Sequence, residues 1–159
     1  MTTETEEGLA RAQEQAQAQL ESIRAMVARL DHSQDCNGED CELTDAEILE
    51  GLSLAGDAAD EEDRTLYHNE DAAIEAIRCD ALSFEVRSDW HGIGEDTEDT
   101  EYAILLCTGG PAVRITGELD GGVPATASLE YQDWFTPWTD APLSAADKGA
   151  LISYAAAIA

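Results

Sequence analysis

The chain has 159 residues, of which 43% are hydrophobic, and this length and composition suffice for one domain with a buried core. Its 35 acidic and 8 basic residues give a formal net charge of −27, which disfavours nucleic acid and anionic membranes as direct partners because like charges repel. The charge is −3 over residues 1–31, −14 over residues 32–80 and −10 over residues 81–159. The acidity therefore belongs to the body of the chain, and it favours basic proteins as partners.

Residues 3–31 are predicted to form one long helix, with acids near its start and arginines near its end. Its apolar residues recur at alternating steps of four and three, which is a heptad pattern interrupted once, at Gln13. Two interpretations fit this stripe: the helix packs on its own domain, or it pairs with a second copy in a homodimer. The dimer seam would consist of Ala16, Leu20, Ile23, Val27 and Leu30.

The next part of the chain is predicted to be helical after an initial loop at residues 35–42. Thr44 is followed three residues later by Glu47, which is the pattern of a capping box at the start of a helix. A second helix is expected over residues 57–80, with a break near Asn69.

After this helical part the apolar residues begin to alternate with polar ones, as is typical of strands. Four strands are predicted from the runs LSFEVRSDW, EYAILLCT, AVRITGEL and ATASLEYQDW, and the turns GGP and DGG connect the last three. Ser144 then caps a last helix. The predicted fold class is α+β: a four-stranded antiparallel meander covered by helices. The single acidic domain at residues 32–159 divides into helices over 32–80, a sheet over 81–140 and a C-terminal helix over 144–157.

An aromatic cluster lies in the run YQDWFTPWT at residues 131–139, which holds Tyr131, Trp134, Phe135 and Trp138. Such a cluster forms a binding surface in some proteins. More often it covers the end of a hydrophobic core, and this is the interpretation that we favour here.

Residues that carry catalytic or metal chemistry are few. His32, Cys36 and Cys41 are three candidate zinc ligands, but no second ligand pair follows at a suitable distance. His91 and Cys107 would form a Cys–His pair if their strands were neighbours. No nucleophile elbow, phosphate loop or dinucleotide fingerprint is present, so we expect neither an enzyme nor a cofactor nor a metal site.

The cysteines and the hydropathy indicate the compartment. The four cysteines are scattered over different contexts, and we expect reduced thiols in a cytoplasm. No apolar run approaches the length of a membrane span, and the N-terminus lacks the pattern of a signal peptide.

The acidic residues gather in three clusters, at residues 39–50, 57–63 and 95–101. In the last cluster five acids occur within seven residues, and an extended chain would then carry about one charge per 4.6 Å. A single DNA strand carries one per about 3.4 Å, so a rigid array of this kind would fit a basic DNA-binding cleft. The predicted partner-binding residues are Glu39, Asp40, Glu42, Asp45, Glu47, Glu50, Asp57, Asp60, Glu61, Glu62, Asp63, Glu95, Asp96, Glu98, Asp99 and Glu101.

Two alternatives to DNA mimicry are open at this point. Adaptation to high salt also produces an acidic chain that is poor in lysine, and Lys148 is the only lysine here. Salt would screen the self-repulsion, although acids acquired in this way should be spread evenly rather than clustered. A generic acidic interaction domain without mimicry belongs with this first alternative. The second alternative is a basic protein partner of another kind.

In size, charge and lack of catalytic motifs, the chain resembles the phage and mobile-element inhibitors that imitate DNA, of the anti-CRISPR and anti-restriction types. The segment at residues 102–138, with YAILLCTGGPAVRITGELDGG followed by LEYQDWFTPW, also looks like short orphan proteins of phages and prophages. The resemblance implies an antagonist of host defence that acts in the cytoplasm of an infected bacterium. It assigns no role to any residue, because DNA mimics share a layout of charge rather than a motif.

Overall fold

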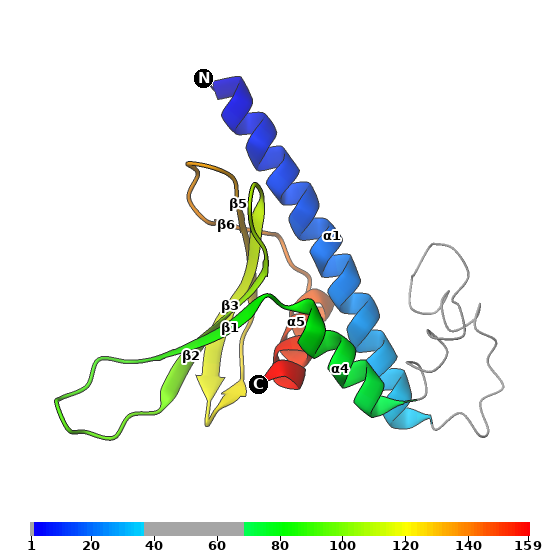
Figure 1. The fold of residues 1–159 in the computed structure, drawn as a ribbon, viewed down its shortest axis with the longest axis vertical. Coiled ribbons are helices and arrows are strands. Elements are labelled where there is room, and N and C mark those ends of the chain that lie inside the picture. Colours follow the sequence, from blue (N-terminus) through cyan, green and yellow to red (C-terminus); the bar gives the residue numbers. More distant parts are fainter. Residues whose placement is uncertain (1, 37–68) are drawn as a thin grey trace.

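The computed structural model describes residues 2–36 and 69–159. The described residues form an α+β fold with a long N-terminal helix and an antiparallel sheet, as expected (Figure 1). The helices are α1 (Thr2–Asp35), α4 (Glu70–Asp80) and α5 (Ala145–Ile158). The strands are β1 (Ser83–Ser88), β2 (Asp99–Cys107), β3 (Ala112–Asp120), β4 (Val123–Pro124), β5 (Ser128–Gln132) and β6 (Thr139–Asp140).

The sheet has the order β1-β2-β3-β5-β6, with β4 paired to β3, so the prediction of four strands was too low. The four long strands follow one another as the predicted meander. The two additional strands, β4 and β6, have only two residues each. A strand of two residues has no alternation that a sequence pattern could detect.

The predicted hairpin at DGG is confirmed, and its turn connects β3 to β4. Gly121 and Gly122 have φ angles of 59° and 82°, and Asp120 pairs with Val123 across them. Two consecutive residues with positive φ are typical of a type I′ turn, whose twist matches that of the flanking strands.

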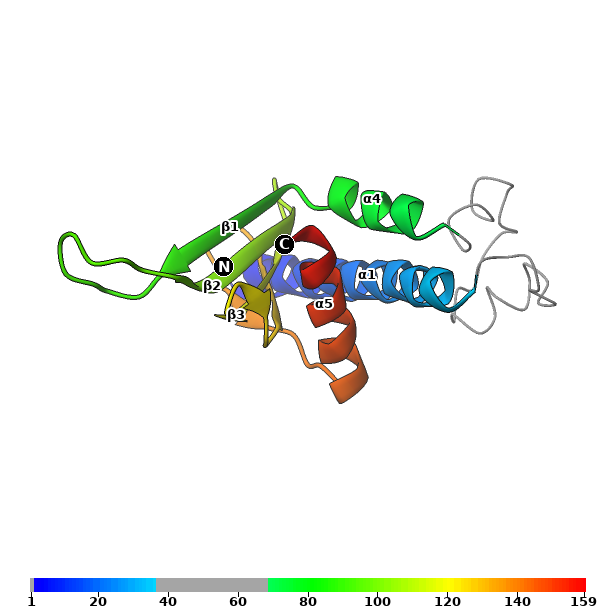
Figure 2. The same ribbon diagram turned by 90° about the horizontal axis from the view of Figure 1, so that it is seen from below.

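The helices α1, α4 and α5 lie on one side of the sheet, as Figures 1 and 2 show. The sheet residues that face them are buried, and they alternate with half-buried or exposed residues along β2, β3 and β5. The fully buried members of the core with the largest side chains are Tyr154, Ile23, Ile77, Ile104, Ile115, Leu129, Leu151 and Val113. The opposite face of the sheet carries no helix of the described residues.

The heptad stripe of α1 is buried within the chain itself, so the proposed dimer seam is not available to a second copy. Its residues belong to the one core cluster that also contains residues of the sheet, α4 and α5. Of the two interpretations of the stripe, packing on the chain's own domain is therefore correct. The exposed fractions are 1% for Ala16, 3% for Leu20, 0% for Ile23, and 6% for both Val27 and Leu30.

The starts of α4 and α5 follow from capping residues. The predicted break near Asn69 is the N-cap of α4, where the Asn69 side chain accepts a hydrogen bond from the amide of Ala72. Ser144 caps α5 as predicted, and it forms a reciprocal capping box with Asp147. The predicted capping box at Thr44 and residues 57–68 of the second predicted helix lie outside the described residues.

Candidate functional site

The candidate site is the distal part of the β1–β2 hairpin, residues 87–101, which we call the acidic arm. The prediction of an exposed hairpin loop at one end of the sheet is confirmed, because every residue from 89 to 99 is exposed. Both ribbon views show this loop extending beyond the end of the sheet and away from the helices (Figures 1 and 2). The described sequence from residue 88 to residue 113 contains no lysine or arginine.

The tip of the arm is a tight turn that the arm's own backbone holds. The Glu95 amide donates to the Gly92 carbonyl at 3.2 Å, and Gly94 between them has a φ of 81°. This is the pattern of a type II turn, which requires glycine at its third position. The Glu95 carboxylate in turn accepts a hydrogen bond of 2.8 Å from the Gly92 amide. Glu95 therefore has a structural role in addition to its charge.

The base of the arm is closed by an ion pair between Arg87 and Glu101, which lie directly opposite each other on β1 and β2. The hydrogen bond from Arg87 holds the pKa of Glu101 below its ordinary value. Thr100 adds a weak hydrogen bond to the Arg87 carbonyl at 3.4 Å. Because its charge is balanced by Arg87, Glu101 contributes less to the arm's negative field than its position in the sequence suggests.

The five predicted contact acids of the arm therefore fall into three kinds. Glu95 supports the turn, and Glu101 is paired with Arg87. Asp96, Glu98 and Asp99 make no side-chain hydrogen bond or ion pair with any described residue, and they are exposed. The other eleven predicted contact acids, from Glu39 to Asp63, lie outside the described residues.

The arm also carries two apolar side chains that sequence reasoning did not single out. Trp90 and Ile93 have relative exposures of 104% and 108%, so neither packs against the protein. Trp90 was assigned to the end of the first predicted strand, but β1 ends at Ser88. The signal that would have found both is their place in WHGIG, where glycines on either side of Ile93 exclude a regular strand.

The face of the sheet that the helices leave open is polar and hollowed. One hollow of about 450 Å³ is lined by residues of β1, β2 and β3 and by two residues before β5 and at its start. A second hollow of about 650 Å³ lies at the base of the arm, where Trp90 and His91 contribute to its lining. Arg87 and Glu101 line both hollows, so the open face of the sheet leads directly to the arm.

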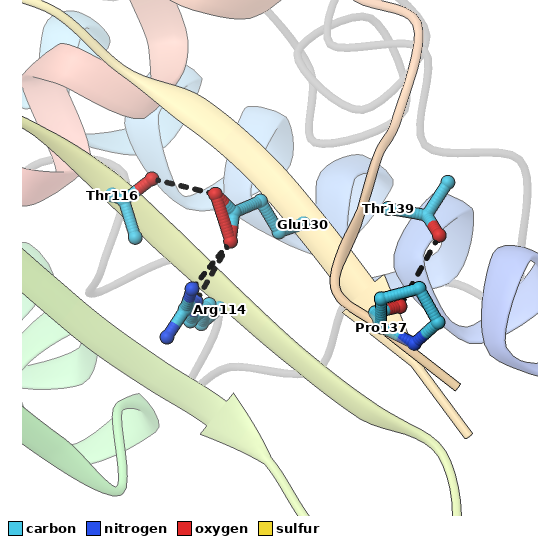
Figure 3. A network of polar contacts seen from close by, with 5 residues as sticks. All are labelled: Arg114, Thr116, Glu130, Pro137 and Thr139. Atoms are coloured by element: carbon cyan, nitrogen blue, oxygen red, sulfur yellow. Dashed lines mark hydrogen bonds and ion pairs between the residues drawn. The ribbon is translucent and has the colours of Figure 1, made fainter. Parts of the chain in front are cut away.

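A network around Arg114 stabilises the centre of this open face (Figure 3). Arg114 donates two hydrogen-bonding contacts, of 2.8 and 2.7 Å, to one carboxylate oxygen of Glu130. Thr116 donates to the other oxygen at 3.3 Å. The Arg114 guanidinium also lies 4.1 Å from the centre of the Trp138 ring, a cation–π contact. The guanidinium of Arg114 therefore makes its contacts with Glu130 and Trp138 within the fold.

The aromatic cluster of residues 131–139 does not act as one unit. Tyr131 is buried in the core, and Trp138 is half-buried under Arg114. Trp134 and Phe135 are instead 64% and 103% exposed, and Phe135 has a φ of 64°. The favoured interpretation, a cover for the core, therefore holds for Tyr131 only, because Trp138 packs against Arg114 on the open face of the sheet.

The one catalytic pair that the sequence suggested is not formed. Cys107 ends β2, whereas His91 lies on the arm beyond the start of that strand, so the strand's length of about 27 Å separates them. Burial raises the pKa of the Cys107 thiol, which further reduces the reactive thiolate. Among residues 2–36 and 69–159, no group of three His, Cys, Asp or Glu side chains is placed to hold a metal ion. The candidate ligand Cys41 is outside these ranges.

Comparison of the sequence and the fold with known proteins gives no relative from which a function could be transferred. No family model matches the chain, and neither the curated proteins nor the solved structures contain a significant match. A membrane-spanning helix is not found in the described part of the chain, since none of its helices combines the necessary length and apolarity. The function must therefore be inferred from the arm.

Proposed function

We propose that the protein is an acidic DNA-mimic inhibitor of the anti-CRISPR type. It binds the basic nucleic-acid-binding surface of a host defence effector and blocks the binding of DNA. The observation that carries this proposal is the acidic arm, which presents Glu95, Asp96, Glu98 and Asp99 at an exposed tip without a neighbouring base. If the five residues 95–99 bind in an extended form, their four carboxylates correspond to about one charge per 4 Å, which is close to the spacing of about 3.4 Å along a DNA strand.

The construction of the arm also favours binding. The turn at Gly92 and Glu95 and the ion pair between Arg87 and Glu101 fix both ends of the charged segment. A segment that is already ordered loses less conformational entropy when it binds. The acids would meet the Lys and Arg side chains that normally contact phosphate, and the attraction would accelerate association.

Clustering separates this proposal from salt adaptation. The surface of α1 carries Arg11 and Arg24 among its acids, and on the sheet Arg87 and Arg114 each pair with a glutamate. The tip of the arm has no such compensation. Charge acquired only for solubility in salt should be spread evenly over the described surface rather than gathered without bases on a projecting hairpin.

The test is a triple substitution that leaves the arm's structure intact: Asp96→Lys, Glu98→Lys and Asp99→Lys. These three side chains have no partner among the described residues, and Glu95 is kept because it holds the turn. The matched control changes three exposed acids of α1 that are spaced by one heptad, Glu7→Lys, Glu14→Lys and Glu21→Lys. Both variants change the net charge by the same amount.

The assay measures phage survival in bacteria with an active CRISPR system, and DNA binding by the purified effector complexes in gel shifts. The wild-type chain and the α1 variant are expected to restore phage survival and to block DNA binding, whereas the arm variant does neither. Equal loss in both variants would mean that net charge alone matters. If the wild-type chain inhibits no effector, and folds only in molar salt, the acids serve the solvent and the proposal fails.

A further inference from the structure

The acidic arm combines its charge with exposed apolar surface, and this second feature needs its own explanation. Folded proteins seldom expose large apolar side chains fully, and when such side chains lie together they mark an interaction site. Trp90 and Ile93 are both fully exposed and lie three residues apart on the half of the arm that follows β1. Neither contributes to the core, so the stability of the fold does not account for them.

The charge of the arm determines what kind of surface covers these side chains. A membrane or a nucleic acid would be repelled by the carboxylates that follow at residues 95–99. A second copy of the chain would bring an equal negative charge. The occupant that fits is a protein groove with basic residues along one side and apolar or aromatic residues along the other.

A groove of that chemistry is the binding site of single-stranded nucleic acid. Such grooves combine Lys and Arg that follow the backbone with aromatic side chains on which the bases stack. The arm has the matching layout, because the carboxylates of residues 95–99 lie on the half that leads into β2, whereas the indole of Trp90 lies on the half that follows β1. The acids of residues 95–99 also follow one another along a single segment of the arm, so they offer one row of charge rather than the two rows of a duplex.

We propose, on the basis of the function proposed above, that the arm imitates a single strand. Its carboxylates take the place of phosphates, while Trp90 stacks in the place of a base and Ile93 packs beside it. The partner is then a protein groove that holds single-stranded nucleic acid, rather than a duplex-binding cleft.

Four single variants test the apolar part. Trp90→Ala and Ile93→Ala remove the two side chains, and neither change touches the core. Trp134→Ala and Val123→Ala are the matched controls, since they delete an exposed tryptophan and an exposed aliphatic side chain elsewhere, at 64% and 60% exposure. Each variant is immobilised as a full chain and exposed to nuclease-treated bacterial lysate at low salt.

Retained protein is eluted either with a 20-nucleotide oligo(dT) strand or with a 20-base-pair duplex at the same phosphate concentration. The strand is expected to elute the partner from the wild-type chain at a lower concentration than the duplex. Trp90→Ala is expected to weaken retention about 5- to 150-fold, the range for loss of one stacked aromatic. Ile93→Ala should weaken it less, and both controls should retain the partner fully.

The outcomes separate this inference from the function on which it rests. Elution by the duplex at an equal or lower concentration, or unchanged retention by Trp90→Ala, overturns the single-strand inference. DNA mimicry survives either result if the arm triple variant still loses the partner. No retention by the wild-type chain, or retention that neither nucleic acid displaces, refutes the inference and the proposed function together.

Discussion

Removal of Ile23 tests whether α1 belongs to the core or to a seam between two chains. Ile23 is fully buried in the cluster that joins α1 to the sheet and to the other helices. Ile23→Ala deletes three buried carbon atoms at about 0.8 kcal/mol each, or about 2.4 kcal/mol of transfer free energy. The cavity left behind raises the expected loss to about 3–4 kcal/mol, within the usual range of about 2–5 kcal/mol. For a chain of this size the midpoint of thermal unfolding should fall by about 6–16 °C.

The assay is urea and thermal unfolding, followed by circular dichroism at 222 nm at two protein concentrations that differ 20-fold. Ile93→Ala is the matched control, because it makes the same deletion at a fully exposed site and should stay within about 0.5 kcal/mol of the wild type. Neither the wild type nor Ile23→Ala should show a midpoint that depends on concentration. A midpoint that rises with concentration, or a loss at Ile23 no larger than at Ile93, would refute burial of the stripe within one chain.

Two further predictions concern the sheet and the contact between α4 and α5. In urea denaturation, Gly117→Ala should lower the free energy of unfolding by about 1–3 kcal/mol, because an added Cβ would lie 2.0 Å from the carbonyl oxygen of Thr126. The control Gly110→Ala should change this free energy little, because no atom lies within 4 Å of its added Cβ. Burial, together with the hydrogen bond to Asp80, raises the pKa of Tyr154 above its ordinary value. As the pH rises, the unfolded chain therefore loses this phenolic proton before the folded chain does. The free energy of unfolding should then fall as the pH rises above about 10. Tyr154→Phe should reduce this alkaline slope in denaturation measured between neutral and high pH, and equal slopes in the two proteins would contradict the assignment.

Much of the fold was predictable because its patterns are local. The stripe on α1, the N-caps at Asn69 and Ser144 and the alternation along β3 each follow from residues close together in the sequence. The surface against which the α1 stripe packs was not predictable. A heptad stripe looks the same whether it packs against a second copy or against the chain's own sheet, and only the tertiary arrangement distinguishes the two.

The charge of the arm was predictable from clustering, but the state of each acid was not. Glu101 is balanced by Arg87, fourteen positions earlier, and this pair depends on the register of β1 and β2. The bond from the Gly92 amide to Glu95 depends in the same way on a turn that only the three-dimensional structure defines. The exposure of Trp90 was missed because the alternation of the first strand appeared to continue through it, whereas pairing with β2 stops at Ser88.

The distribution of the bases explains how one fold carries so large a charge and still leaves a contact surface free. Arg24 pairs with Asp147 between α1 and α5, and Arg87 and Arg114 pair with glutamates across neighbouring strands. In the described residues these arginines offset repulsion where elements must pack together. The tip of the arm packs against no described element, and both ribbon views show the arm projecting from the body. At physiological salt, exposed charges that lie more than about 8 Å apart are largely screened from one another. Uncompensated acids therefore cost the fold least at the place where a basic partner can reach them most easily.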